Sequence, residues 1–311
     1  GAPRIAEYTN ATHTSLIDPH TRSWSDEIYS AIGLDRSAAP ELVPAGTSLG
    51  PLRHHLRRLP AFANTQLIAP ACHDTASAIA GIPQPAGDWA YISSGTWSLV
   101  GMLVSEFHRT PEALASNFTN LGAAGGGVLF HCGIPGMWLL RQCLDPWESD
   151  RKWNLDDLIA ASRLLPAPDA VLDLADPAFV SPGDMPGRIN AQRRRRGLAP
   201  LAESASNAPL YANLLFHSLA SRYRALIEKL VELTGRQPRR ICVVGGGSRN
   251  DYLNSLTSDR TGVPVVRCSA ESSTLGNFAV QWARLKHESN PISAPQIADR
   301  VHDLAQAGIE F

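Results

Sequence analysis

The 311-residue sequence lacks several features that identify common classes of protein. It has no apolar run of the roughly 18 residues that a membrane-spanning helix requires, and it shows no signal peptide. It also has almost no net charge, because 28 lysines and arginines are balanced by 29 aspartates and glutamates. We therefore expect neither a membrane nor a nucleic acid as partner, since nucleic-acid binding depends largely on excess positive charge.

Cysteine is scarce. The five cysteines are widely spaced and form no C-x-x-C pair, which argues against a disulfide framework and against a zinc site. Cys242 lies in an apolar stretch and is predicted to be a small buried hydrophobic residue. A small number of unpaired cysteines is typical of a protein in a reducing cytoplasm, which is what we expect here. The other four cysteines are Cys72, Cys132, Cys143 and Cys268.

Methionine is absent from the first hundred residues. The chain begins Gly1-Ala2-Pro3, and its first methionine is Met102. We expect such a chain to be a piece of a longer protein. Its balance of 44% hydrophobic and 18% charged residues is typical of globular proteins, and its length suits two domains.

Hydrophobic periodicity predicts mixed α/β structure. A helix is expected within 23–34, with Ser25 as cap and an apolar face of Trp24, Ile28, Ile32 and Leu34. A strand at 65–71 is followed by a helix, and a hairpin turns at Ser94-Gly95. Residues 120–144 suggest a glycine-rich loop running into a helix, and 153–200 suggest short helices with turns. Arg193-Arg194-Arg195-Arg196 is predicted to be an exposed helix end.

The C-terminal third carries the strongest pattern. Apolar residues at spacings of three and four predict one long helix over 207–233, ended by Thr234-Gly235. A strand, a triple glycine, a helix and a second strand then predict a βαβ unit with parallel strands over 239–266. Another helix is expected over 271–285, and Gly81–Gly87 suggests a domain boundary. On the long helix predicted over 207–233, the apolar residues at this spacing form one stripe, which consists of Leu215, Leu219, Tyr223, Leu226, Leu230 and Leu233.

Three short stretches could carry chemistry. Asp74, in "ACHDTASAIAG", follows a strand and begins a helix, so its carboxylate could bind a ligand or simply cap a helix from Thr75. Ser94-Gly95-Thr96 could hold phosphate oxygens or merely turn a hairpin. Gly245-Gly246-Gly247 could accept a ligand against bare backbone or could reflect close packing.

A fourth stretch, Gly46-Thr47-Ser48-Leu49-Gly50, matches the G-x-S-x-G pattern of serine hydrolases. That pattern needs a strand directly before it and a helix directly after it. Pro44 and Pro51 instead indicate loop on both sides. Hydrolysis through Ser48 is therefore the weakest of the functional hypotheses.

The order of several motifs is far more specific than any one of them. "HDTASAIAGIP", "WAYISSGTWSLVG", "FTNLG", "GMWLLRQ", "VVGGGSRNDYLNSLTSDRTGVPV" and "ESSTLGN" together resemble the FGGY carbohydrate kinases, as do "EYTNATHTSLID" and "MPGRINAQRRRRGLAP". The resemblance implies an α/β fold of the actin-like ATPase (ribonuclease-H-like) sugar-kinase type. It further implies that 1–81 is the end of the sugar-binding domain and that 82–311 is a complete nucleotide-binding domain. Roughly 150 residues of the family pattern would then precede residue 1.

The resemblance also assigns roles. Asp74 would be the general base for transfer of the γ-phosphoryl group from ATP to a ketose, most closely the 1-hydroxyl of L-rhamnulose, and His73 and Thr75 would contact the sugar. Ser94, Gly95 and Thr96 would meet the β- and γ-phosphates. Gly245, Gly246, Gly247 and Asn250 would surround adenosine. Mg²⁺ would bridge the phosphates, held by acidic groups through water.

Some positions depart from the family pattern. Leu121 stands where a glutamate is expected, Cys132-Gly133 where Lys-Asn is expected, Arg141 where Gln is expected, and Cys72 where Gly or Ser is common. These departures leave open a different ketose, a changed nucleotide pocket, or neutral change on a tolerant loop. They also leave open a non-catalytic fragment that binds nucleotide or sugar. The oligomeric state of the chain is not predicted.

Overall fold

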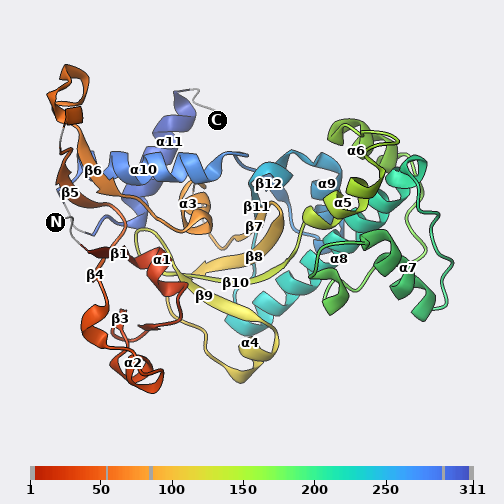
Figure 1. Cartoon of the computed structure of the whole chain (residues 1–311), viewed down its shortest axis with the longest axis horizontal. Coiled ribbons are helices and arrows are strands. Elements are labelled where there is room, and N and C mark those ends of the chain that lie inside the picture. The colour runs from red at the N-terminus through yellow and green to blue at the C-terminus, as the bar shows by residue number, and fades with distance from the viewer. Residues whose placement is uncertain (1–3, 54, 84–86, 289–290, 308–311) are drawn as a thin grey trace. The chain divides into compact units, whose positions relative to one another are not determined.

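The computed structural model describes residues 4–53, 55–83, 87–288 and 291–307 (Figure 1). The chain forms two compact units, which are described separately. Unit 1 comprises Gly1–Ala86, Met102–Phe130 and Glu271–Phe311, and unit 2 comprises Gly87–Gly101 and His131–Ala270. Within the described part of the chain, no helix has both the length and the apolar character needed to cross a membrane.

Unit 1 begins with short strands and helices. β1 (Ile5–Glu7) pairs in parallel with β4 (Glu41–Val43), and α1 (Tyr8–Thr12) follows β1 directly. A small core forms from Ala11, Ile17, Trp24 and Tyr29. The remaining elements before residue 70 are β2 (Ile17–Asp18), β3 (Ser23–Trp24), α2 (Asp26–Ala31) and the antiparallel hairpin of β5 (Thr47–Pro51) and β6 (Gln66–Ala69).

The helix predicted within 23–34 is confirmed as α2, and Ser25 caps it by accepting a hydrogen bond from the Ile28 N–H at 3.2 Å. Its predicted apolar face is wrong in part. Ile32 and Leu34 lie beyond the helix and are exposed, because the helix ends after only six residues, whereas Trp24 is buried but belongs to β3. Tyr29 is the helix residue that enters the core instead.

Helices make up the rest of unit 1. α3 (Asp74–Ala80) lies against α10 (Ser272–Lys286) and α11 (Ala294–Gln306), as Figure 1 shows. The helix predicted over 271–285 is thereby confirmed. α4 (Pro111–Ala115) precedes β9 (Phe118–Gly122), which lies beside the first half of β10 (Val128–Pro135). The prediction of a glycine-rich loop over 120–144 missed β9 and β10, because glycines with positive φ at Gly125, Gly126 and Gly127 turn the chain between two strands.

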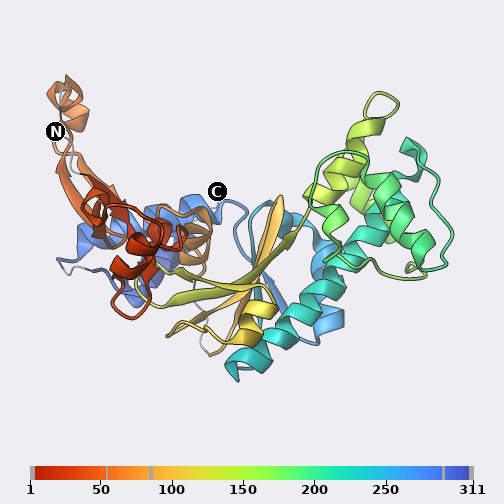
Figure 2. The ribbon, with the colours of Figure 1, turned by 60° about the horizontal axis from the view of Figure 1, so that its bottom comes forward.

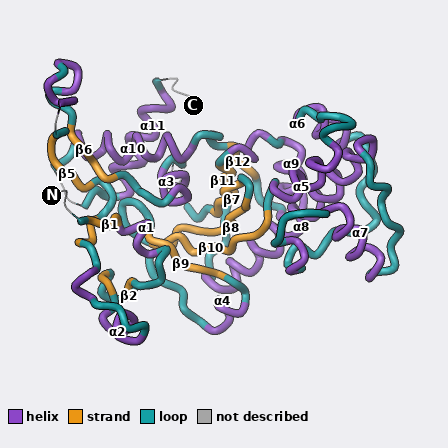
Figure 3. Tube along the Cα trace, viewed as in Figure 1, coloured by secondary structure: helices purple, strands orange, loops and turns teal. Residues whose placement is uncertain are grey.

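Unit 2 is built on a sheet whose strands follow the order β12-β11-β7-β8-β10 (Figure 3). β7 (Ala90–Ser94) and β8 (Trp97–Val104) form the predicted hairpin. β11 (Ile241–Val244) pairs in parallel with both β7 and β12 (Val265–Arg267), which confirms the predicted βαβ unit with α9 (Asp251–Thr261) as its helix.

The predicted long helix is α8 (Ala208–Thr234), the long teal helix of Figure 2. Gly235 ends it with φ 66°, a left-handed conformation that glycine adopts without steric cost. The stripe from Leu215 to Leu230 is buried, and Leu233 is half-buried. α5 (Trp138–Leu144) and α6 (Leu155–Arg163) pack against α8, and α7 (Met185–Arg195) packs against α5.

The four-arginine run does lie at the end of α7, but the prediction that it is exposed is wrong for Arg193. This side chain is buried, and its guanidinium donates two hydrogen bonds to the Asp169 carboxylate, at 3.0 and 3.1 Å. Arg195 pairs with Asp176. Arg196 also donates a hydrogen bond to the Val171 carbonyl, so three of the four guanidinium groups contact other parts of this unit. Single turns of 3₁₀ helix complete the fold at Arg36–Ala38, His55–Arg58, Pro60–Phe62, Asp145–Trp147, Pro177–Phe179, Ala205–Asn207 and Gly246–Arg249.

Candidate functional site

In unit 1, the predicted catalytic carboxylate stands at the start of α3. Asp74 is the first residue of the helix, and His73 is the N-cap, with its Nδ1 accepting a hydrogen bond from the Thr75 N–H at 3.2 Å. The prediction of a helix that starts at Thr75 under an Asp74 cap is therefore off by one residue. The Asp74 carboxylate also accepts from the Thr75 N–H, at 2.6 Å, yet its side chain is 87% exposed.

The electrostatics of this turn favour the neutral form of His73. Burial lowers the pKa of His73 and the neighbouring His13 ring lowers it further, whereas the Asp74 carboxylate raises it. The His73 Nδ1 lies 3.3 Å from an Asp74 oxygen, but Nδ1 accepts the Thr75 N–H and so carries no proton for an ion pair. Asp74 is thus not neutralised by the histidine beside it. Burial, helped by the charge of Glu7, raises the pKa of the exposed Cys72 thiol.

Asp74 faces an open depression of about 520 Å³. Most of its exposed lining is apolar, but α10 contributes the hydroxyl groups of Ser273 and Thr274 and the amide of Asn277. Ser273 also donates a hydrogen bond to the Asp74 carbonyl at 3.3 Å. Such groups suit a polyhydroxylated ligand. The lining residues are Pro70, Ala71, Cys72, Asp74, Ser77, Ser273, Thr274, Asn277 and Phe278.

A close crossing of two helices fixes α3 in unit 1. A Cβ atom at Gly276 of α10 would lie 1.9 Å from the Ser77 carbonyl oxygen, and one at Gly81 would lie 2.4 Å from the Ser272 carbonyl oxygen. Both distances are far inside van der Waals contact, so only glycine fits at either position. The helix that begins with Asp74 is therefore held by backbone-to-backbone packing.

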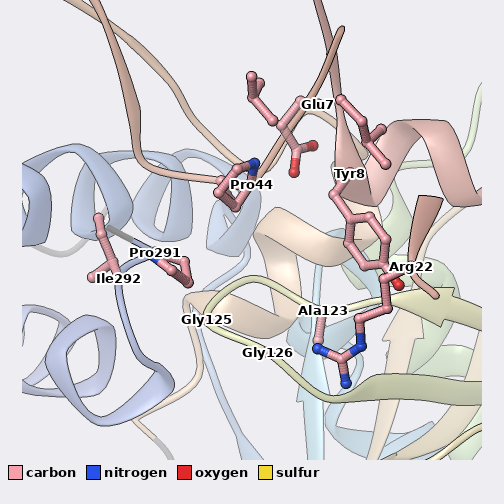
Figure 4. Close-up of a pocket in the computed structure, with 12 residues that line it drawn as sticks. Glu7, Tyr8, Arg22, Pro44, Ala123, Gly125, Gly126, Pro291 and Ile292 are labelled. Carbon is pink, nitrogen blue, oxygen red and sulfur yellow. The ribbon is translucent and has the colours of Figure 1, made fainter. Parts of the chain in front are cut away.

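A second cavity in unit 1, of about 270 Å³, is separate from the predicted site residues (Figure 4). Glu7, Tyr8 and Arg22 lie on one side of it and Pro291 and Ile292 on the other. The remaining lining residues are Leu42, Val43, Pro44, Ala45, Ala123, Gly125 and Gly126.

In unit 2, the predicted phosphate loop is a tight turn between β7 and β8. The Gly95 N–H donates to the Trp97 carbonyl at 2.9 Å, so this amide is already used within the turn. The Thr96 carbonyl accepts from the Gly136 and Trp138 N–H groups, both at 3.1 Å, which ties the turn to the start of α5. The Thr96 side chain is exposed, and its hydroxyl has no hydrogen-bond partner among the residues that the structure describes.

The structure brings this turn together with the triple glycine. β7 and β11 are parallel neighbours, with Ser93 opposite Val244, so Ser94 and Gly245 follow at the same sheet edge. A Cβ at Gly247 would lie 2.0 Å from Ser94 Oγ, and one at Gly245, where φ is 82°, would lie 2.8 Å from the Ser94 carbonyl oxygen. Close packing therefore accounts for Gly245 and Gly247.

Gly246 differs from its two neighbours. A Cβ there would meet nothing within 4 Å, so the backbone at this position borders open space. Beside it, Ser248 Oγ and Asn250 Nδ2 are buried, and neither atom has a hydrogen-bond partner within the described ranges. Asn250 Oδ1 caps α9 by accepting from the Leu253 N–H at 3.0 Å. The open backbone at Gly246 leaves room for a ligand, whereas the Ser248 and Asn250 side chains are buried.

The departures from the family pattern lie in different environments. Leu121 is buried in β9, and Cys132 is buried in β10. Gly133 is exposed, and Arg141 lies on the surface of α5, paired with Asp145 and Glu148. Ser48 lies within strand β5, so the prediction of loop at Pro51 is wrong, because Pro51 is the last residue of that strand. No helix directly follows β5 among the described residues, and no nucleophile elbow forms there.

Comparison with known proteins identifies the family of this chain. The model of the FGGY family of carbohydrate kinases, C-terminal domain, matches residues 90–284. The chain belongs to this family. A rhamnulokinase from Enterococcus faecalis is 37% identical over 279 residues, which cover 89% of this chain and 55% of that relative. A rhamnulokinase from Bacteroides thetaiotaomicron is 34% identical over 296 residues, covering 95% of this chain and 60% of the relative.

Solved structures of family members show the same fold. A xylulose kinase from Rhodospirillum rubrum aligns with a TM-score of 0.68 at 15% identity, covering 95% of this chain and 58% of that one. Plasmodium falciparum glycerol kinase, solved with ADP, gives 0.68 at 14% identity, covering 96% and 57%. The predicted actin-like sugar-kinase fold is thereby confirmed. The chain spans little more than half the length of the curated relatives that it matches.

Sequence reasoning missed several residues around Asp74. Glu7, Thr9 and Ser273 hydrogen-bond to the backbone of residues 72–74. Glu7 and Thr9 lie within "EYTNAT", which the family resemblance singled out, but nothing in the sequence couples that motif to a turn more than 60 residues away.

Proposed function

We propose that the chain forms part of a kinase that transfers the γ-phosphoryl group of ATP to a ketose, with L-rhamnulose and its 1-hydroxyl as the acceptor. The identity of 37% with a rhamnulokinase over 279 residues carries this proposal. The exposed carboxylate of Asp74, beside a depression to which α10 contributes hydroxyl and amide groups, and the open backbone at Gly246 support it. In terms of the family domains, residues 1–81 would belong to the sugar-binding domain and 82–311 to the nucleotide-binding domain.

Asp74 would act as the general base. An ionised carboxylate that is exposed and not paired with a protonated histidine can accept the proton of a sugar hydroxyl as that hydroxyl attacks phosphorus. His73 and Thr75 would border the sugar. Because phosphoryl transfer needs mainly positioning, the rigid start of α3 matters as much as the basicity of the carboxylate.

The nucleotide would lie along the sheet edge of unit 2. ATP supplies the phosphoryl group when bound. The Thr96 hydroxyl would donate to phosphate oxygens, Gly246 would leave room for the nucleoside, and Asn250 would lie at the same pocket. The described residues contain no group of three His, Cys, Asp or Glu side chains suited to a metal. We propose, as the family resemblance implies, that Mg²⁺ accompanies the nucleotide and is held by acidic groups through water.

Titration calorimetry of Mg²⁺-ADP into the 311-residue chain tests the nucleotide site. We expect saturable binding that weakens at least about tenfold in Gly246→Leu, because the side chain would start in the open space beside the backbone, where a Cβ meets no protein atom within 4 Å. The exposed Ser48→Ala variant serves as control and should bind like wild type. No binding by the wild type at about millimolar ADP would contradict the nucleotide site.

A phosphotransfer assay with a panel of ketoses then separates the remaining alternatives. Transfer to L-rhamnulose supports the proposed acceptor, and transfer only to another ketose would overturn that choice of acceptor while keeping the kinase activity. Nucleotide binding without transfer to any ketose would favour a non-catalytic binding function for this chain.

A further inference from the structure

The motif Glu7-Tyr8-Thr9 holds the turn before Asp74 through two side chains. Glu7 is the N-cap of α1, and its Oε1 accepts the Thr9 N–H at 2.9 Å. Its other oxygen, Oε2, accepts the Thr9 hydroxyl at 2.5 Å and the backbone N–H of Cys72 at 2.9 Å. The Thr9 Oγ1 accepts the backbone N–H of His73 at 3.2 Å.

Capping of α1 alone does not explain this arrangement. A cap needs one carboxylate oxygen, and Oε1 already performs that role. Oε2 instead reaches a backbone amide 65 residues away, from a side chain that is only 5% exposed. Burying a carboxylate is costly unless its oxygens are hydrogen-bonded, and here all three donors come from the motif and from the turn.

Every residue of the turn is fixed in a similar way. The Ala71 carbonyl accepts from Ser77 Oγ at 2.7 Å, and the Asp74 carbonyl accepts from Ser273 Oγ at 3.3 Å. Together with Glu7 and Thr9, these contacts restrain four consecutive residues while the Asp74 carboxylate itself stays exposed. The backbone of the turn is therefore restrained by side chains from two distant segments.

We propose that Glu7 and Thr9 are positioning residues for Asp74. This inference rests on the proposed function of Asp74 as general base. By holding the N–H groups of Cys72 and His73, the pair sets the point at which α3 begins and so the direction in which its first carboxylate projects. Neither side chain contacts the reacting atoms, and a misplaced base lowers the rate of transfer without changing nucleotide affinity.

Two substitutions at Thr9 test the proposal. Thr9→Val has nearly the same shape but lacks the hydroxyl, so the His73 N–H and Glu7 Oε2 each lose a partner. Thr9→Ser keeps the hydroxyl. We expect kcat for ketose phosphorylation to fall about tenfold in Thr9→Val, with KM for ATP unchanged within about twofold, and to stay near wild type in Thr9→Ser.

Amide hydrogen exchange of the same variants gives a readout that does not depend on activity. In Thr9→Val the amides of Cys72 and His73 should exchange about tenfold faster, whereas those of the β11–β12 pair should not change. Faster exchange with an unchanged kcat would overturn the positioning role, and so would unchanged exchange. If the wild type transfers no phosphate, the proposed function fails instead, and the exchange rates alone decide whether Thr9 holds the turn.

Discussion

Asp74 combines a fixed backbone with an exposed carboxylate. Its carbonyl and the two amides before it are hydrogen-bonded to other segments, while its side chain is 87% exposed. A general base needs this combination, because the carboxylate must reach a ligand while its main chain stays in place. The residues that hold the turn and the residue that would react are thus different ones.

Asp74→Asn removes the basic oxygen with almost no change in shape. We expect kcat for ketose phosphorylation to fall by about 100- to 10,000-fold, with Mg²⁺-ADP affinity kept. The matched control is the exposed Asp150→Asn, which should leave both quantities unchanged. Steady-state kinetics and calorimetry on the same preparations provide the measurement, and wild-type turnover in Asp74→Asn would remove this residue from the mechanism.

The three consecutive glycines show that neighbouring residues of one type can have different roles. Gly245 and Gly247 are needed because the Ser94 main chain and side chain leave no room for a Cβ. Gly246 has free space on the same turn and is the one position where a ligand could explain the glycine. The sequence alone treats these three residues alike.

At the scale of elements, the crossing of α3 and α10 decides where the start of α3 lies within unit 1. The helices approach closely enough for Gly81 and Gly276 to be in contact with the opposite backbone. A backbone atom cannot move aside as a flexible side chain can, so a methyl group at this crossing would push the helices apart.

Gly276→Ala should therefore destabilise the protein by about 1–3 kcal/mol. The control on the same helix is Leu285→Ala, whose side chain is exposed and whose loss should change the free energy of unfolding by no more than about 0.5 kcal/mol. Urea denaturation followed by far-UV circular dichroism measures both. Equal stability of Gly276→Ala and wild type would mean that the helices can separate at no cost.

At the scale of the whole molecule, two histidines make stability depend on pH. Burial lowers the pKa of His73 and of His217, and the Arg260 guanidinium lowers that of His217 further. His217 Nδ1 accepts a hydrogen bond from Arg260 at 3.0 Å, so the neutral ring suits the folded state. The unfolded chain, where a histidine has a pKa of about 6.5, then binds more protons than the folded chain.

The free energy of unfolding should consequently be highest above about pH 6.5. It should fall as the pH drops from there toward the lower pKa values of the two histidines in the folded chain. The other ring nitrogen of His217, Nε2, hydrogen-bonds to the Tyr252 hydroxyl at 3.1 Å. His217→Gln offers both an acceptor for Arg260 and a donor for Tyr252 without titrating, and it should reduce the loss of stability between pH 7.5 and 5.5. The exposed His302→Gln should leave it unchanged. Urea midpoints at the two pH values test this, and an identical loss in wild type and His217→Gln would show that His217 does not contribute.

The sequence by itself determined the elements with strong local signals. The stripe from Leu215 to Leu230 and the terminal Gly235 defined α8, and the strand–glycine–helix–strand pattern defined β11, α9 and β12, because period and end signals are local properties. The order of motifs also identified the family, which the match over residues 90–284 confirms. The residues assigned to the sugar and nucleotide sites remain predictions.

Only the tertiary structure decided which residues meet. It buried Arg193 against Asp169 and joined Glu7 and Thr9 to the turn before Asp74. It showed that Gly245 and Gly247 are packed against Ser94, whereas Gly246 borders open space. It also made strands of β9 and β10, where the glycine content had suggested a loop. The physical reason is common to all of these cases. Such contacts connect residues far apart in the chain, and a hydrogen bond or a steric limit between distant segments leaves no periodic signal in either one.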